Sequence, residues 1–352
     1  MRIRRGGWIC VCCFSLVSGF AQQSGSAGGS APPGTAGRPM TLDVAVTDKA
    51  GRPVSGLQQQ DFTLLDNKLP QKILSFDAVT AAPGPPVEVI LLVDEVNIQF
   101  TKLGSEREQI ERFLSGNGGA LPHPVLLVFF GDSGLTFGSG PSRDGDALIA
   151  ELRREWPSLR TIGKSQGIYG DQERLHLSIH ALQRLIDYGL TRPGRKLVVW
   201  VSPGWPILAG PDLQLTFREK QGIFVSVVNL SAGLREARIT LYAVDPLGLE
   251  DAAELRTSEY KQYLKGVKRV GQAQMGDVAL QVLAAQSGGR VLNSSNDVAG
   301  EILACIADAN ASYILSFGSL AGNGPDEYHA LDIKIDKPGL AARTRSGYYA
   351  QP

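Results

Sequence analysis

The chain has 352 residues, of which 43% are hydrophobic and 20% are charged. A chain of this length and composition can bury one large core or two smaller ones, so we expect a globular protein. The 35 Lys and Arg residues balance the 35 Asp and Glu residues. No field of one sign is therefore available to hold nucleic acid or an anionic membrane surface, and nucleic acid is excluded as the expected partner.

Residues 1–21 have the pattern of a signal peptide. Arg2, Arg4 and Arg5 precede the apolar run "WICVCCFSLVSGF", which is too short to span a bilayer, and small residues up to Ala21 form a cleavage site. We expect an exported protein, which is periplasmic, on the cell surface or secreted, with no stable membrane insertion after cleavage. An uncleaved anchor is the alternative.

Two features follow from this processing segment. Residues 22–39, "QQSGSAGGSAPPGTAGRP", are rich in Gly, Ser and Pro and are predicted to be a flexible linker. Three of the four cysteines lie in residues 1–21, which leaves Cys305 in the remaining chain. Since Cys305 falls on the apolar face of a predicted helix, we expect a small buried side chain rather than a reactive thiol.

Strands are predicted next, over residues 40–80. "TLDVAVTD" alternates apolar and polar residues at 41–47 and ends at a turn sequence. "DFTLLDNKLPQKILSFDAV" predicts a hairpin with strands at 62–65 and 72–79 and a turn around Asp66 and Asn67. Three short strands are not stable without further strands or helices to pair with or pack against.

Residues 86–311 alternate between strands and amphipathic helices. The predicted strands lie at 87–93, 125–130, 196–201, 239–244 and about 289–293. The predicted helices begin at Ser105 and Asp171 or cover about 144–155, 221–236, 251–264, 277–286 and 297–310. This alternation predicts an α/β fold with a doubly wound, mostly parallel sheet that is covered by helices on both faces.

Strands return over residues 312–350. "SYILSFG", "YHALDIKID" and "ARTRSGYY" are separated by Gly, Asn, Pro and Asp. Because the strands of 40–80 and of 312–350 both need partners, we predict that they form one small all-β, Ig-like domain, into which the α/β domain of residues 86–311 is inserted.

Five segments occur in an order that is specific enough to compare with a family. They are "VTDKAGRPVSGLQQQDFTLLDNKLPQKILSF", "VILLVD", "ITLYAVDPLGL", "SGGRVLNSSNDVAGEI" and "YHALDIKIDKPGLAARTRSGYYA". This pattern resembles the von Willebrand factor type A (VWFA)-related group found in exported bacterial proteins, especially those of acidobacteria. The resemblance implies a von Willebrand A-like, Rossmann-like sheet with any site at the carboxyl edge of its strands.

The resemblance also implies where a metal-ion-dependent adhesion site (MIDAS) would lie. Such a site uses Asp-x-Ser-x-Ser after the first strand, a later threonine and an aspartate after a further strand. Asp94 matches the first position, but Val96 and Ile98 replace the serines, and "WVSPGW" offers Ser202 in place of the aspartate. With Asn97 added, the set Asp94, Asn97 and Ser202 has too few oxygens to hold Mg²⁺ or another divalent cation. We therefore predict a degenerate site without a cofactor, in which Asp94 and Asn97 cap backbone groups.

Other motifs fit catalysis poorly. His176 and His180 have the spacing of a zinc pair, but Leu177 occupies the position of the catalytic glutamate. "GDSGL" around Ser133 lacks the Gly-x-Ser-x-Gly pattern of a nucleophile turn. We predict no catalytic residue.

Two functions remain. The first is a noncatalytic binding module that meets an unidentified protein partner with the strand carboxyl ends around Asp94, Asn97, Gln99, Ser202 and Trp205. The second is a hydrolase that uses the polar residues of the same edge. We favour the binding module because no nucleophile, base and orienting group can be named together.

Overall fold

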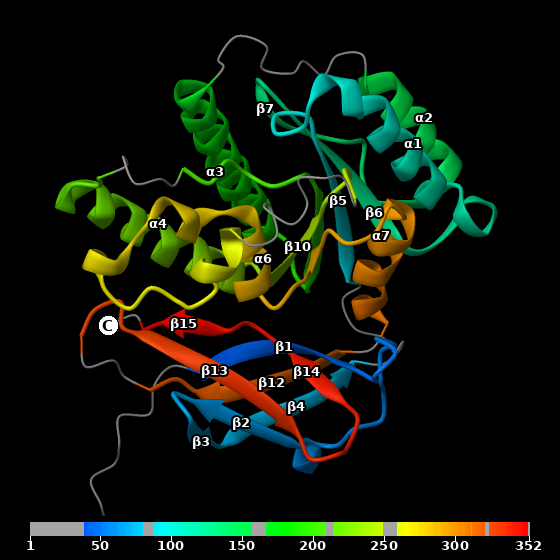
Figure 1. Cartoon of the computed structure of the whole chain (residues 1–352). Helices are drawn as coiled ribbons and strands as arrows, with labels where there is room; N and C mark the ends of the chain where they lie inside the picture. Colours follow the sequence, from blue (N-terminus) through cyan, green and yellow to red (C-terminus); the bar gives the residue numbers. More distant parts are fainter. Residues whose placement is uncertain are drawn as a thin grey trace, which may run out of the picture. The chain divides into compact units, whose positions relative to one another are not determined.

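The central sheet has the strand order β11-β10-β9-β5-β6-β7, with β8 also paired to β6. Figure 1 labels β5, β6, β7 and β10 of this sheet. This computed structural model describes residues 39–79, 87–156, 167–208, 214–248, 259–310, 312–320 and 324–350. The parallel strands are β5 (Glu88–Asp94), β6 (Ala120–Gly131), β9 (Lys196–Val201), β10 (Ile239–Val244) and β11 (Val291–Leu292). Numbered along the chain, they lie in the order 2-1-3-4-5, which is a doubly wound order. The predicted mixed α/β fold with a mostly parallel sheet is confirmed.

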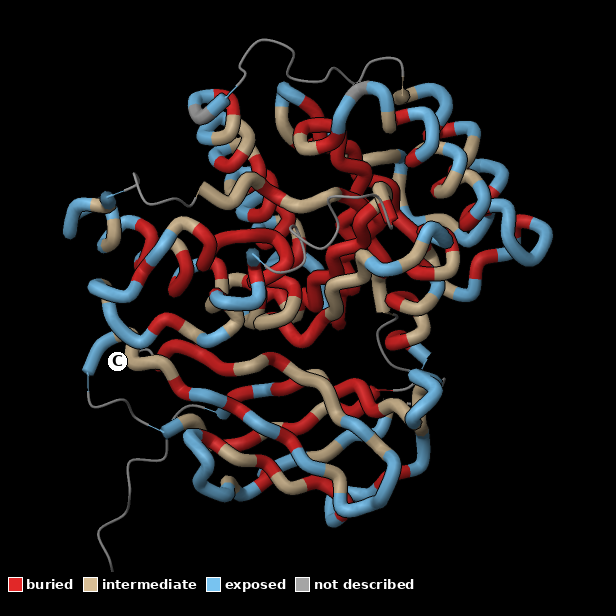
Figure 2. The backbone as a smooth tube through the Cα atoms, viewed as in Figure 1, coloured by how far each residue is buried: buried red, intermediate tan, exposed pale blue. Residues whose placement is uncertain are grey.

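Helices cover both faces of this sheet. One face packs against α3 (Ile168–Leu190), α4 (Phe217–Glu236) and α6 (Leu280–Gln286), and the other against α1 (Leu103–Leu114), α2 (Gly145–Glu155) and α7 (Val298–Ile306). Short 3-10 helices are η1 (Gln59–Asp61), η2 (Phe100–Lys102), η3 (Gly116–Gly119), η5 (Tyr260–Tyr263), η6 (Val270–Gln272), η7 (Met275–Val278) and η8 (Ala307–Ala309). Figure 2 shows buried residues concentrated along the central strands, as a sheet covered on both faces requires. Within the described ranges, no helix combines the length and apolar character needed to cross a membrane.

Strands from the two ends of the chain pair with each other in both antiparallel sheets. One sheet has the order β14-β1-β12-β4 and the other β15-β13-β2-β3. Their bounds are β1 (Pro39–Thr47), β2 (Phe62–Asp66), β3 (Leu69–Gln71), β4 (Ile73–Val79), β12 (Ser312–Gly318), β13 (Tyr328–Ile335), β14 (Ala341–Arg343) and β15 (Gly347–Tyr349). Leu42, Leu64 and Phe317 belong to the core that these strands share. The predicted pairing between the chain ends is therefore present, while the Ig-like assignment stays a prediction.

The domain boundaries also stay predictions. The signal peptide of residues 1–21 and the linker of residues 22–39, except Pro39, lie outside the described residues. Pro39 itself begins β1.

The first strand of the predicted hairpin and its turn after Asp66 are present, but the predicted pairing of residues 62–65 with 72–79 is wrong. Asn67 and Lys68 both have positive φ, 48° and 69°, as the two central residues of a type I′ turn require. This tight turn returns the chain as the short strand β3, which pairs with β2. The chain then enters the other sheet, where β4 pairs with β12.

A second hairpin was not predicted. β7 (Gly134–Phe137) is antiparallel to β6, with Gly131 opposite Gly134, and β8 (Ser142–Asp144) also pairs with β6. Gly134 has φ 97°, a conformation that glycine adopts at little cost. The "GDSGL" sequence around Ser133 is therefore the turn of an edge hairpin.

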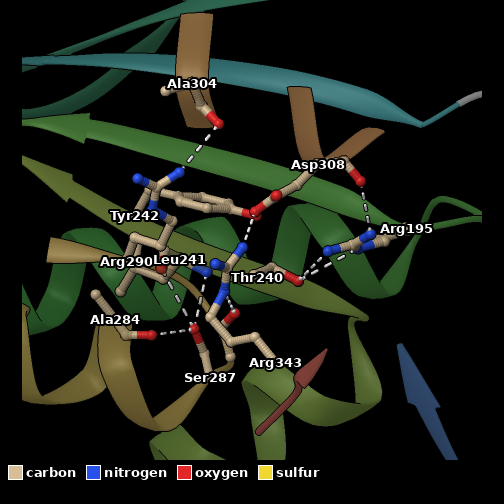
Figure 3. Close-up of polar contacts among 11 residues, drawn as sticks. Arg195, Thr240, Leu241, Tyr242, Ala284, Ser287, Arg290, Ala304, Asp308 and Arg343 are labelled. Carbon is tan, nitrogen blue, oxygen red and sulfur yellow. Dashed lines mark hydrogen bonds and ion pairs between the residues drawn. The ribbon is translucent and has the colours of Figure 1, made fainter. Parts of the chain in front are cut away.

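A buried polar cluster ties β14 to the central sheet (Figure 3). Asp308 of η8 forms an ion pair with Arg343 of β14 and accepts a hydrogen bond of 2.6 Å from the hydroxyl of Tyr242 in β10. Arg343 Nε also donates to the backbone oxygen of Gly288 at 2.9 Å. Arg195 donates to the backbone oxygen of Asp308 at 3.3 Å. One carboxylate thus links the strands of the chain ends to the parallel sheet.

Removing this charge should weaken the fold. We expect Asp308→Asn to lower the free energy of unfolding by about 2 to 4 kcal/mol. The substitution leaves Arg343, whose side chain is 27% exposed, without its anion. Urea unfolding measures the loss, and Asp332→Asn on the exposed side of β13 is the control. Asp308→Asn combined with Arg343→Met should recover part of the loss; equal stability of Asp308→Asn and the parent would contradict the role of the pair.

The pairing of the chain ends predicts the effect of truncation. A chain of residues 39–311 lacks β12 and β13, so β1 and β2 lose the partners that their backbone groups need. Compared with residues 39–352, it should lose the single cooperative transition in urea, followed by circular dichroism. An unchanged midpoint would show that the N-terminal strands do not depend on the C-terminal ones.

Candidate functional site

The carboxyl ends of β5 and β9 mark the point where the strand order reverses. From β5 the chain passes to β6 on one side and then returns to β9 on the other side of β5. Ligand crevices of doubly wound sheets open at this point. The register places Val93 opposite Val201, so the residues that follow them, Asp94 and Ser202, are neighbours at the edge.

Asp94 is fully buried and its carboxylate is surrounded by donors. Oδ1 accepts hydrogen bonds from the backbone N–H groups of Val96 and Asn97, both at 3.0 Å. Oδ2 accepts from Asn97 Nδ2 and from Trp200 Nε1, both at 2.8 Å. Burial raises the pKa of Asp94, while hydrogen bonds from Asn97, Trp200 and Ser202 oppose this shift. Both oxygens are thus engaged by groups that can only donate, which is the environment of an ionised carboxylate.

The residues around Asp94 do not fit a divalent cation. Val96 and Ile98 are buried apolar side chains, and an amide or indole N–H group that points at a carboxylate oxygen occupies the direction a metal would need. Among the described residues, no group of three or more His, Cys, Asp or Glu side chains could hold a metal ion.

The predicted site residues differ in their exposure. Asp94, Asn97 and Ser202 lie together. Trp205 is only 3% exposed and packs edge to face against Trp200, with ring centroids 5.1 Å apart. Gln99 is exposed beyond them. The edge at the reversal point is therefore closed by side chains, and Gln99 is the predicted residue with most access to solvent.

Two residues of this region were not predicted, Trp200 as a donor to Asp94 and Ser178 as a partner of Asn97. Asn97 Nδ2 donates to Ser178 Oγ at 3.0 Å, and Ser178 Oγ donates to the backbone oxygen of Arg174 at 2.8 Å. These bonds join the turn after β5 to α3. Alternation along β9 could have placed Trp200 on the same face as Ser202, but the strand register that brings it to Asp94 is not visible in the sequence.

A pair of buried acids lies on the other face of the sheet. Glu95 is 1% exposed and Glu106 is 0% exposed. Glu95 Oε1 and both carboxyl oxygens of Glu106 have no hydrogen-bond partner among the described residues. Burial first, and then the charge of Asp94, raises the pKa of Glu95 to about 8; burial, Asp94 and Glu95 raise the pKa of Glu106 well above its usual range. The helical spacing of Glu106 with Ile110 is the signal that could have placed it on the buried face.

The remaining candidates have structural or surface positions. His176 and His180 are exposed on α3, with ring centroids 6.5 Å apart. Ser133 lies in the turn between β6 and β7. Cys305 is fully buried, as predicted, and burial raises the pKa of its thiol.

Comparisons with known proteins give weak structural similarity. No protein-family model and no curated protein matches the chain. The manganese-loaded TRAP protein of Plasmodium vivax is similar with a TM-score of 0.36 and 11% identity, over 79% of this chain and 99% of that one. A von Willebrand factor type A protein from Catenulispora acidiphila gives 0.33 and 10%, over 89% and 75%. The pilus adhesin SpaC from Lactobacillus rhamnosus GG gives 0.35 and 11%, over 85% and 49%. At these values no family or function follows from the similarity.

The pKa of Glu95 predicts a pH dependence of stability. Between pH 4.5, the ordinary value, and about 8, the folded state holds a proton that the unfolded state releases. The unfolded state binds fewer protons, so stability falls as pH rises through this window, by at most about 1.4 kcal/mol per pH unit for one group. Glu95→Gln has no carboxyl group at this position that could ionise. The variant should therefore show a smaller decrease in the free energy of unfolding between pH 5.5 and 7.5, measured by urea unfolding.

Exposed Glu108 provides the control for this experiment. Glu108→Gln should leave the slope of stability against pH unchanged. A Glu95→Gln variant with the slope of the parent would show that Glu95 ionises in the folded protein as easily as in the unfolded chain.

Proposed function

We propose that the chain is an exported, noncatalytic protein-binding module of the von Willebrand A type, with a degenerate adhesion site and a small Ig-like domain built from both chain ends. One observation supports this most directly: the oxygens of Asp94 are occupied by donors from Val96, Asn97 and Trp200. A catalytic base needs a lone pair that faces its substrate, and a metal ligand needs one that faces the ion. Asp94 instead serves as a structural acceptor.

The hydrolase alternative lacks a set of reacting groups at this edge. Ser202 Oγ accepts a hydrogen bond from the backbone N–H of Gly204 at 3.1 Å and is bonded to Asp94. Ser202 is 2% exposed, so its hydroxyl does not face solvent. A nucleophile that meets a substrate would need access as well as a base.

The binding surface on this proposal lies outside the closed edge. Gln99 is exposed, and two residues later Thr101 begins the lining of a pocket of about 470 Å³ between the start of α1 and the segment after β10. Thr101, Ser105 and Asn296 are among its lining residues. Asp94, Ser202 and Trp205 hold this edge in place from beneath, and an unidentified partner protein meets its exposed side chains.

The proposal predicts no stabilisation by divalent cations. Binding to the folded state alone would add about 2.7 kcal/mol at a hundredfold excess over Kd, whereas millimolar Mg²⁺, Mn²⁺ or Ca²⁺ should leave the melting temperature where it is in EDTA. Asp94→Ala should cost about 1 to 3 kcal/mol with or without metal, because its donors lose their acceptor.

The parent protein and Asp94→Ala also provide the result that would contradict this proposal. A melting temperature that rises with metal in the parent, and not in Asp94→Ala, would mean that Asp94 binds a cation and that the adhesion site is functional. Turnover of a panel of ester and peptide substrates that disappears in Ser202→Ala would instead favour the hydrolase.

A further inference from the structure

Helices α3 and α4 touch near their C-terminal ends because glycines allow it. A Cβ atom on Gly233 of α4 would lie 2.8 Å from Ile186 of α3, and one on Gly189 of α3 would lie 3.0 Å from Ala237, which follows α4. Both distances are shorter than ordinary van der Waals contact, so a larger residue at either position would require its neighbour to shift. Between the N-terminal halves of the same helices lies a groove of about 960 Å³.

The floor of the groove is formed by apolar side chains that are only partly buried. Its lining includes Leu177 and Ile179 of α3, Leu208 and Leu215 from the segment before α4, and Met275 of η7. All five pack against the main core but are only partly buried. A concave apolar surface that remains open to solvent is typical of a binding site.

The groove is lined by two carboxylates and by two histidines, His176 and His180 of α3. Glu173 of α3 and Glu219 of α4 are the carboxylates among its lining residues. The hydroxyl and the backbone N–H of Thr216 lower the pKa of Glu219 and keep it ionised. Two acids beside an apolar floor favour an occupant that combines apolar groups with positive charge.

The length of the groove suits a short helix. Its lining residues on α3 extend from Tyr169 to His180, which at 1.5 Å per residue is about 17 Å, or three helical turns. At one end the ring of Tyr169 is 79% exposed. Amphipathic helices bind such grooves with apolar residues at positions i, i+3 or i+4, and i+7.

We propose that the α3/α4 groove binds an amphipathic helix of a partner protein whose apolar face is flanked by Lys or Arg. This inference rests on the proposed binding function and adds a second surface, the α3/α4 groove, to the one near Gln99. The apolar face covers Ile179, Leu215 and Met275, and the basic residues lie opposite Glu173 and Glu219.

Gly222 provides a direct way to close the groove. It lines the groove on α4, and a Cβ atom added there meets no atom within 4 Å. Gly222→Ala therefore fits without a clash and should raise the melting temperature, since alanine favours a helix over glycine. Gly222→Phe should fill the groove while the core beneath it is unchanged.

The test begins with a displayed library of random peptides, long enough for about four helical turns, selected on the full chain. We expect enriched peptides to show the helical spacing of apolar residues together with Lys or Arg. Their Kd should rise at least tenfold in Gly222→Phe and stay unchanged in Gly222→Ala. Glu173→Gln should weaken binding several-fold and reduce its dependence on salt.

Several outcomes would overturn the proposal. These are no enrichment, enrichment of acidic or nonhelical peptides, or peptides that bind Gly222→Phe as well as the parent. A dimer of the parent that Gly222→Phe converts to a monomer would identify a second copy as the occupant. If Gly222→Phe does not fold, Ser226→Phe, one turn further along the same lining, replaces it.

The same peptides separate this inference from the proposed function. Cleavage of a bound peptide would contradict the noncatalytic function even if the groove holds the peptide. Binding without cleavage that survives both groove-filling variants would contradict only the α3/α4 groove.

Discussion

The buried carboxylate of Asp94 requires donors, and the elements around it are arranged to supply them. It lies at the end of β5, where the turn that follows provides two backbone N–H groups and β9 provides the indole of Trp200. Asn97 extends the connection to Ser178 of α3. A buried charge without these partners would be strongly unfavourable. The same bonds therefore stabilise the reversal point of the sheet and close the crevice that such a point offers to ligands.

Neighbouring acids at this edge take opposite roles because successive side chains of a strand point to opposite faces. Asp94 faces the side of Trp200, where donors stabilise its ionised form. Glu95 faces the side of Glu106, where burial and the charge of Asp94 favour the protonated form. The difference lies in hydrogen-bond supply rather than in residue type. At neutral pH the protonated, buried Glu95 and Glu106 lower the stability of the fold. The hydrogen bonds to the ionised Asp94 fix the shape of the edge.

The strands of the chain ends depend on contacts that are distant in sequence. β1 pairs with β12 from Pro39 opposite Gly318 to Ala45 opposite Ser312, and Arg343 joins β14 to Asp308. The central α/β segment must therefore leave its two ends close to each other. The strands of the chain ends join the α/β segment where its first strand begins, which is the end of the central sheet opposite its carboxyl edge. A partner bound at the carboxyl edge would therefore contact surfaces that the chain-end strands do not form.

Periodicity could locate elements that are buried on both sides but not those at edges. The strands 196–201 and 239–244 agree with β9 and β10 because each is a continuous buried run. β3 was missed because it is only three residues long and contains Pro70, and β7 was missed because its turn, Asp132–Ser133, lacks the usual Asn-Gly or Gly-Gly pair. For the site, Val96 and Ile98 already showed that oxygens were lacking around Asp94. One donor to Asp94 comes from Trp200, a residue 106 positions away whose approach is set by strand register. Short-range patterns can therefore predict that oxygens are lacking near Asp94, but only the strand register shows which donors surround its carboxylate.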